Sequence, residues 1–600
     1  MPFQPRRRAL LRTVPAAGLV LGGAGCATQP TGTDAADPWK RADDIVARFA
    51  TPQRFREEDF PITSYGAKPC AMVETKGQTA SLVNGTLRTP APNSPDAYPA
   101  IAAAIKACNA KGGGRVVIPA GDWYCAGPIV LLSNVHVHLA AGARVHFSAN
   151  PEHYARHGEF DCGANGKLTL SRWQGNDVLN YSPMVYAYNQ TNIALTGADW
   201  TSILNGQGGV PFEHKKDECW WDWKGRGKPA RIRTEIAPNP VNAPLAQVAP
   251  NMPQAQRELI QGEGWQTDSR YLPALSEAKV PVAKRVFGRG HFLRPCMIEF
   301  IGCTKVLMQG YQVNATPFWL HHPVNCRDLV IRGVNMESLG PNSDGFDPEA
   351  CDGVLVEDCT FNNGDDCIAI KAGKNLDTQF GPTRNIVIQR CIMNSGHGGV
   401  TLGSEMAGGI EHIYARNLEF RNVHWASDPL NTAIRLKTNM NRGGFLRHLY
   451  VRDVTIPNGV QIEPGWYKPL DGAKEITQRV ASTAGAIITI DCDYVPADDA
   501  VRTRPPQVSD IDIRGVRTQN ARTKDGSFSC YQAFVLLGPV ASSYNGAPGA
   551  AIPPITRVRI SDSDFGTPKN GAQPWFVHNA TGITLENVTI AGKKYNTSLS

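Results

Sequence analysis

The most regular feature of the sequence is a short phrase in which apolar and polar residues alternate, and which recurs along most of the chain. Alternation with a period of two predicts β-strands with one buried face. In the most regular stretch, three such phrases begin at Lys305, Asp328 and Gly353, so that their spacing is nearly constant. The other copies lie at 134–139, 192–197, 385–390, 448–453 and 582–587.

No helical pattern separates the three central phrases, so a coil of short strands that stacks on the next coil accounts best for the repeat. We therefore predict an all-β chain folded as a right-handed parallel β-helix. A β-propeller fits less well, because its blades need about 40 residues or more. Cys303, Cys326 and Cys351 recur at the same intervals as the phrases, and we interpret them as stacked interior residues rather than disulfides.

The start of the chain departs from the repeat. Residues 1–26 have the pattern of an export signal, with a twin-arginine-like pair at Arg7 and Arg8, a short apolar run and small residues before Cys26. The residues before Cys26 resemble a lipobox with Gly23 at its first position. A lipid anchor at Cys26 and simple cleavage of the signal are both compatible with this pattern.

Residues 27–55 are rich in Ala, Thr, Asp and Pro and are interpreted as a linker, followed by a β-helix domain over 56–600. The repeat is interrupted at about 208–292 by a long insertion rich in tryptophan and proline. Its aromatic side chains could form a small core of their own or a wall of a binding cleft.

Composition and charge narrow the function classes. The chain has 58 Gly and 44 Pro among 600 residues, which suits an all-β protein with many turns. Its formal charge of +7 falls to about +3 without the four arginines of the signal, which gives no support to nucleic-acid binding. The apolar run of the signal is too short to span a bilayer, and no later segment qualifies.

Four polar motifs interrupt the apolar pattern in the second half of the chain. They are Asn342-Ser343-Asp344, Gly364-Asp365-Asp366, Gly396-His397-Gly398 and Arg435-Leu436-Lys437. The separation of Asp344 and Asp365 is close to one coil, so we expect them side by side at about 4.8 Å in the stacking direction. Arg435 and Lys437 lie at alternate positions and point to the same face of a strand.

On an ideal strand Asp366 would face away from Asp365, so the chain must bend there, which Gly364 permits. Three carboxyl groups this close cannot all ionise cheaply, and at least one should keep its proton near neutral pH. One carboxylic acid and one carboxylate are what glycoside hydrolysis requires. His397 can support the acid, and the two cations can hold the carboxylate of an acidic sugar.

Each motif taken singly also has a plain structural reading, as a polar turn, a hydrogen-bonded histidine or a solvated strand face. All four at coil-compatible spacing resemble the signatures of glycoside hydrolase family 28, the polygalacturonases: Asn-Thr-Asp, Gly-Asp-Asp, Gly-His-Gly and Arg-Ile-Lys. Residues 112–121 and 316–324 also resemble that family. Ser343 for threonine and Leu436 for isoleucine are mild departures.

The resemblance implies a role for each position. Asp365 corresponds to the general acid, Asp344 and Asp366 to the carboxylates that activate water, and His397 to the histidine that supports the acid. The implied substrate-binding residues are Asn342, Arg435, Lys437 and Tyr467, with Trp466 competing for the last place. No metal and no cofactor are implied.

The family inverts configuration, although inverting enzymes usually separate their two carboxyl groups by about 6.5–9.5 Å, more than adjacent coils allow. The resemblance implies hydrolysis of α-1,4-galacturonosidic bonds in pectin or polygalacturonate. The insertion, with Gly403-Ser404-Glu405-Met406, resembles the exo-acting members of that family, in which added segments close one end of the cleft, so the resemblance favours exo action. Rhamnogalacturonan and xylogalacturonan hydrolases of the same family are alternatives, as are a Ca²⁺-dependent pectate lyase and a glycan-binding β-helix without activity.

We expect the partner to be an acidic plant cell-wall polysaccharide or its oligogalacturonides. The export signal predicts a periplasmic, outer-membrane-anchored or extracellular protein, and we expect a monomer.

Overall fold

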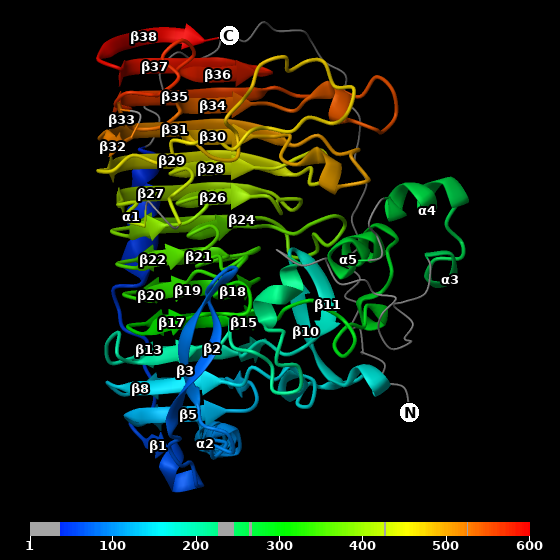
Figure 1. The fold of residues 1–600 in the computed structure, drawn as a ribbon, viewed down its shortest axis with the longest axis vertical. Coiled ribbons are helices and arrows are strands. Elements are labelled where there is room, and N and C mark those ends of the chain that lie inside the picture. The colour runs from blue at the N-terminus through cyan, green and yellow to red at the C-terminus, as the bar shows by residue number, and fades with distance from the viewer. Residues whose placement is uncertain (1–36, 226–244, 263–266, 425–427, 525, 600) are drawn as a thin grey trace, which may run out of the picture.

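The computed structural model describes residues 37–225, 245–262, 267–424, 428–524 and 526–599. They form a tall stack of β-coils with the N-terminal coils at one end and the C-terminal coils at the other (Figure 1). The strands pair almost entirely in parallel, coil upon coil, which confirms the predicted parallel β-helix. The expected export signal, including Cys26, lies outside the described residues.

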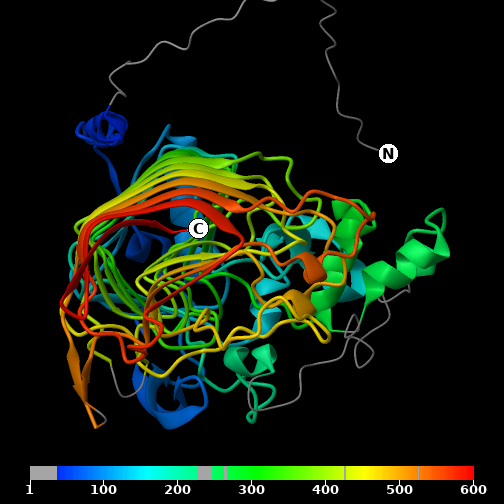
Figure 2. The ribbon, with the colours of Figure 1, turned by 90° about the horizontal axis from the view of Figure 1, so that it is seen from above.

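Three parallel ladders make the walls of the stack, and Figure 2 shows them end on. Ladder one consists of β1 (Asp59–Pro61), β4 (Gly114–Ile118), β7 (Val135–Leu139), β13 (Thr191–Gly197), β16 (Thr304–Gln309), β19 (Arg327–Arg332), β21 (Asp352–Glu357), β24 (Thr383–Gln389), β27 (Ile410–Phe420), β29 (Phe445–Ile456), β31 (Gln507–Thr518), β35 (Ile555–Asp564) and β37 (Ala580–Ile590). Val306, Leu329 and Val354 are register partners in it, so the coil lengths predicted from the three central phrases are confirmed.

Ladder two consists of β5 (Gly121–Cys125), β8 (Ala143–Phe147), β14 (Ile203–Asn205), β17 (Gln312–Asn314), β20 (Asn335–Ser338), β22 (Thr360–Asn363) and β25 (Ile392–Ser395). It joins ladder one where β25 pairs with the end of the longer strand β27.

Ladder three carries the polar motifs. It consists of β6 (Ile129–Val130), β12 (Val185–Tyr188), β15 (Ile298–Ile301), β18 (His321–Val324), β23 (Ile368–Ile370), β26 (Val400–Gly403), β28 (Ile434–Lys437), β30 (Ala486–Asp491), β34 (Gln532–Leu537) and β36 (Trp575–His578). Between β18 and β23 it is reduced to isolated bridges at Phe346 and Glu349.

The apolar residues of the alternating phrases fill the interior of the stack. Cys303, Cys326 and Cys351 are buried there as free thiols, as predicted. The first coils are covered by helix α2 (Tyr98–Ala110), and the last coil is closed by β38 (Lys593–Leu599), which pairs antiparallel with β37. None of the helices in the described ranges has the length and apolarity that a membrane span requires.

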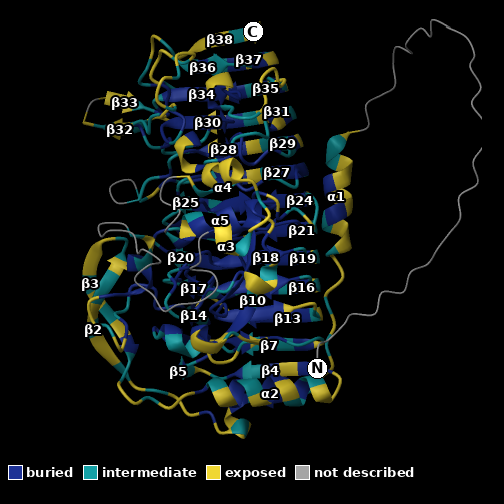
Figure 3. Cartoon of the chain, turned by 90° about the vertical axis from the view of Figure 1, so that its right-hand side faces the viewer, coloured by how far each residue is buried: buried dark blue, intermediate teal, exposed yellow. Residues whose placement is uncertain are grey.

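Part of the segment expected to be a linker is a helix. Helix α1 (Pro38–Arg48) lies along the outside of ladder one and crosses several coils (Figure 3). Its buried residues Ala42 and Ile45 pack against an outward apolar column that includes Val330, Leu355 and Val387. The linker prediction over 27–55 is therefore wrong for this stretch, because a short amphipathic helix gains its stability from tertiary packing rather than from its own sequence.

The insertion after β14 is helical rather than a set of coils. It contains the 3₁₀ turn η4 (Trp220–Lys224) and helices α3 (Leu245–Val248), α4 (Gln254–Gln261) and α5 (Asp268–Glu277), which lie beside ladder three in Figure 1. The helices share a small apolar core with Trp173, Phe318 and Trp319. Trp173 ends β10 (Lys167–Trp173), which forms a hairpin with β11 (Asn176–Asn180). Trp220 instead belongs to the main core, and Trp265 lies outside the described residues.

Candidate active site

The polar motifs meet where ladder three is interrupted. Asp344 lies two residues before Phe346, whose register partner is Ile368, and the N–H of Gly345 donates to the carbonyl oxygen of Asp366 at 2.9 Å. Asp344 is therefore in register with Asp366, not with Asp365. The difference arises because the coil that joins Phe346 to Ile368 is one residue longer than the separation of Asp344 and Asp365.

All three predicted carboxyl groups are nevertheless brought together. One oxygen from each of Asp344, Asp365 and Asp366 lies within 4.8 Å of the others. Gly364 makes this possible by close packing: a Cβ there would lie 2.5 Å from the carbonyl oxygen of Gly340 in the coil before. The turn at Gly364 is thus set by contact between neighbouring coils.

Asp365 is held by two predicted site residues. His397 Nδ1 lies 2.9 Å from Asp365 Oδ1, and Asn342 Nδ2 donates to Asp365 Oδ2 at 3.2 Å. Arg294, which the sequence did not single out, fixes the asparagine by donating to its Oδ1 at 2.7 Å. His397 and Asp365 are the more accessible pair, with side chains 41% and 14% exposed, so they can reach a bound substrate.

Asp366 is fully buried and is paired with both predicted cations. Lys437 Nζ lies 2.6 Å from its Oδ2, and Arg435 Nη1 lies 3.4 Å from its Oδ1. Both cations extend from β28 on the same face, as the spacing predicted. The ring of Tyr494, just after β30, lies 5.4 Å from the Arg435 guanidinium and 5.5 Å from the Lys437 ammonium. Tyr494 was missed, because no signal in its own segment marks it; only the coil register places it there.

The pKa values of Asp344 and Asp365 are shifted in opposite directions. Burial, with repulsion from Asp365 and Asp347, raises the pKa of Asp344 well above its ordinary value. Burial alone would also raise the pKa of Asp365, but the charge and hydrogen bond of His397, together with Lys437 and Lys224, bring this pKa below its ordinary value. Of these two carboxyl groups, Asp344 is the one whose pKa is shifted in the direction expected for a group that keeps its proton.

Tyr467 is not part of this cluster. Its hydroxyl donates to Asp493 Oδ2 at 2.5 Å, and its ring belongs to a separate apolar cluster with Val480 and Val535. The ring beside the cations is that of Tyr494. The placement differs from the prediction because Tyr467 lies in the long loop between β29 and β30, outside the strand register that brings Tyr494 to β28.

The buried carboxyl of Asp493 makes the stability of the protein depend on pH, and this dependence can be measured. Burial raises the pKa of Asp493 to about 7, against about 3.9 in an unfolded chain. The folded protein therefore binds this proton more tightly, so its stabilising contribution is complete below about pH 4 and is lost as the pH rises to about 7. A change of this size corresponds to about 4 kcal/mol.

Asp493→Asn, which keeps the shape and cannot ionise, is expected to raise the unfolding temperature at pH 8 relative to the unaltered protein, with little gain at pH 4. Thermal unfolding at pH 4, 6 and 8 measures this, with Asp512→Asn on the outer face of ladder one as control. An equal loss of stability at all three values would show that Asp493 is not the group that titrates.

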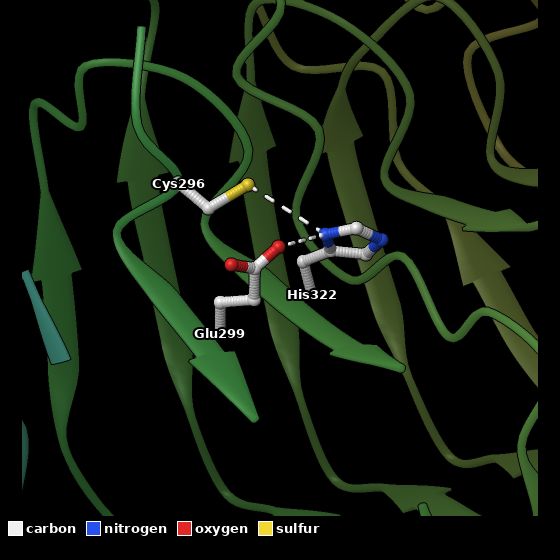
Figure 4. A group of neighbouring side chains, drawn as sticks. All are labelled: Cys296, Glu299 and His322. Atoms are coloured by element: carbon white, nitrogen blue, oxygen red, sulfur yellow. Dashed lines mark hydrogen bonds and ion pairs between the residues drawn. The ribbon is translucent and has the colours of Figure 1, made fainter. Parts of the chain in front are cut away.

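A second buried cluster lies in the coils before the carboxylates. Figure 4 shows Cys296, Glu299 and His322 pointing toward one another. His322 Nδ1 lies 3.0 Å from Glu299 Oε1 and 3.7 Å from Cys296 Sγ, while its Nε2 lies 2.9 Å from Glu349 Oε2. Donor atoms this close could in principle hold a metal ion.

The electrostatics favour an ion pair instead. Burial would lower the pKa of His322, but the hydrogen bonds to Cys296, Glu299 and Glu349 raise this pKa well above its ordinary value. An imidazolium has no lone pair to give to a metal. Burial also raises the pKa of the Cys296 thiol to about 12, and a neutral thiol is a poor ligand.

Comparison with known proteins agrees with the motifs. Residues 289–481 match the family model for glycosyl hydrolases family 28. A probable polygalacturonase of Vitis vinifera is 33% identical over 174 residues, 28% of this chain and 34% of the relative. An exopolygalacturonase of Cochliobolus carbonum is 26% identical over 144 residues, 22% of this chain and 30% of the relative. The matches thus span about a third of the length of these relatives.

Solved structures extend the likeness of fold to most of the chain. The hyperthermoactive exopolygalacturonase from Thermotoga maritima superposes with a TM-score of 0.61 at 23% identity, covering 94% of this chain and 99% of that one. The family 28 exopolygalacturonase of Yersinia enterocolitica gives a TM-score of 0.50 at 17% identity, over 90% and 80% of the two chains. The part of the chain that carries the carboxylate cluster, residues 289–481, is therefore similar to family 28 of the glycosyl hydrolases.

Proposed function

We propose that the protein hydrolyses α-1,4-galacturonosidic bonds of polygalacturonate with inversion of configuration, acting from a chain end. The observation that carries the proposal is the meeting of three carboxyl groups within 4.8 Å, one paired with His397 and one with two buried cations. This site lies within the segment that matches family 28.

In this mechanism Asp365 protonates the glycosidic oxygen. The hydrogen bond of 2.9 Å joins it to His397, so a proton can pass along this contact to Asp365 and on to the leaving group. Asp366, the carboxylate paired with Lys437 and Arg435, draws a proton from the attacking water, and Asp344 orients that water from the neighbouring coil. The carboxyl oxygens are closer than inverting enzymes usually hold them, which makes the stereochemical outcome a direct test.

The substrate class follows from the cations. Arg435 and Lys437 are buried beside Asp366, and burial would lower their pKa values, but the carboxylate keeps both pKa values above ordinary. They remain charged at any pH of interest. The arginine has N–H groups beyond the one facing Asp366, and these suit the carboxylate of a galacturonate.

Exo action is proposed from the insertion. Its helices stand beside ladder three (Figure 1), Asp268 and Ser269 of α5 line one cavity with Asn342, and exopolygalacturonases are among the similar proteins. We further propose that the protein is exported, on the signal-like pattern of residues 1–26.

Analysis of the first products of polygalacturonate tests the function. Reducing ends should appear without ultraviolet absorbance from unsaturated sugars, and a chelator should leave the rate unchanged. A single small product from the start would support exo action, and proton NMR of the fresh product should show the inverted anomer. An unsaturated product whose formation stops on addition of a chelator would mean that the protein is a lyase. A ladder of oligomers would mean endo action. A product with the retained anomer would mean a double displacement.

A further inference from the structure

A groove runs along the outer face of ladder one, between that ladder and the segment 49–58, which leads from the end of α1 to β1 (Figure 3). Its volume is about 1120 Å³. The ladder residues that line it come from five successive strands, β4, β7, β13, β16 and β19, so it extends about 19 Å along the stack at about 4.8 Å per strand. Ladder three, which carries the carboxylate cluster, is a different wall of the stack (Figure 2).

The segment 49–58 is fastened to the ladder by specific contacts. Gln53 Nε2 donates to the carbonyl oxygen of Lys305 at 2.8 Å and to Asn192 Oδ1 at 3.0 Å. Further along the segment, the ring of Phe55 lies 5.1 Å from the ring of His136. The outer wall of the groove is therefore fixed to the same strands that form its floor.

The charges around the groove are mostly positive. Apart from histidines, its charged lining residues are Arg48, Arg54, Arg115, Lys305, Arg332 and Asp328. Three of the arginines already have acidic partners, which are Asp328, Asp59 and Glu357. The side chains of Arg54 and Lys305 are exposed, and among the residues that the structure describes no ion pair or hydrogen bond occupies them. An anion in the groove would thus meet two cations that no carboxylate of the described chain neutralises.

The floor of the groove offers both polar and apolar contacts. Thr196 Oγ1 lies 2.6 Å from His136 Nε2 and 2.8 Å from His138 Nδ1. Burial lowers the pKa of both rings, that of His136 to about 4, so both are neutral near pH 7 and can bond to hydroxyl groups. Leu307 and Val330 add apolar surface. Cations at the rim over such a floor suit a sugar acid, which presents carboxylates, hydroxyl groups and apolar ring faces.

We propose that this groove is a second binding site for an acidic oligosaccharide, in which Arg54 and Lys305 bind uronate carboxylates of a polygalacturonate chain. The identity of the polymer rests on the proposed function. A chain held at the groove raises the effective concentration of polymer ends at the carboxylate cluster on the other wall. An oligomer too short to reach both sites gains nothing, so the groove favours long substrates.

The double variant Arg54→Met/Lys305→Met removes both free cations, and since both are exposed the fold should be kept. In the Asp365→Asn background, which leaves the polymer intact, electrophoresis in gels containing polygalacturonate measures binding. We expect the affinity to fall about 5-fold, because exposed ion pairs contribute little each. Lys593→Met/Lys594→Met removes the same charge from exposed positions of β38 and should change the affinity less than about 2-fold.

Kinetics separate the groove from the carboxylate cluster. With Asp365 in place, Arg54→Met/Lys305→Met should lower kcat/KM for polygalacturonate by a similar factor and leave kcat/KM for trigalacturonate unchanged. An equal loss on both substrates would overturn the proposal, since the two cations would then act on the reaction itself. An equal loss of affinity in the β38 control would overturn it too, since net charge alone would explain the binding.

Two further outcomes identify the ligand and separate this proposal from the proposed function. If single-stranded DNA displaces the protein from polygalacturonate as well as hexagalacturonate does at equal charge, the groove is a general anion site and the uronate assignment fails. If the unaltered protein cleaves no galacturonide but Arg54 and Lys305 still retain it on polygalacturonate, the proposed function fails and the groove stands. Normal cleavage with unchanged retention of Arg54→Met/Lys305→Met refutes the groove alone.

Discussion

Asp365→Asn is expected to lower the rate of polygalacturonate hydrolysis by about 10²- to 10⁴-fold, the usual contribution of a general acid. The carboxamide keeps the size of the side chain and can still bond to Asn342 and His397, so the fold should be unaffected. What is lost is the proton for the leaving oxygen. Reducing-end assays on polygalacturonate measure the change.

An aryl galacturonide separates the roles of the carboxyl groups. Its phenolate leaves without protonation, so Asp365→Asn should recover most of the activity on it. Asp366→Asn, which removes the proposed base, should be inactive on both substrates. Recovery of Asp344→Asn instead of Asp365→Asn would assign the acid to Asp344, whose pKa is raised above its ordinary value by burial and by repulsion from Asp365.

The coils and the site could be predicted because both depend on repetition. Where the coils are short, phrases of alternating apolar and polar residues at a nearly constant spacing predict strands that stack on one another. Two motifs that are one coil apart in the sequence must then lie next to each other in the stack. The single-residue error in pairing Asp344 has the same origin. Ladder three has only isolated bridges at that coil, so there was no strand pattern from which its register could be read.

Other features depend on contacts between distant segments and have no local signal. Tyr494 reaches Lys437 only because two coils separated by a long loop are in register. Helix α1 is stabilised by the apolar column on ladder one, which from sequence looks like an ordinary solvent-facing set of positions. The burial of the outward-facing charges of ladder three likewise could not be predicted from the sequence. The segments that cover these charges, the β10–β11 hairpin and the insertion, come from other parts of the chain.

Among these covered charges, replacement of Arg172 is expected to have the largest effect on the free energy of unfolding. Arg172 is 1% exposed on its side chain, and it pairs with Glu349 at 2.5 Å and with Asp177 at 2.7 Å. Glu349 is fully buried; burial would raise its pKa, but Arg172 and His322 lower this pKa to about 2. The carboxylate is therefore charged at neutral pH and depends on both partners.

Arg172→Met leaves Glu349 and Asp177 without their shared cation, and removal of one partner from a buried ion pair typically costs about 3–5 kcal/mol. We expect a clear fall in the unfolding temperature and in the urea midpoint. Arg384→Met is the matched control: Arg384 pairs with Asp352 at 2.9 Å but is 47% exposed, so its loss should cost about 0–1 kcal/mol. If Arg172→Met does not accumulate, Arg172→Lys retains the positive charge, and its loss of stability should lie between those of the two other variants.

Equal effects of Arg172→Met and Arg384→Met would mean that the hairpin is held by its apolar contacts. A selective loss would show that the Arg172 ion pairs hold the β10–β11 hairpin in place.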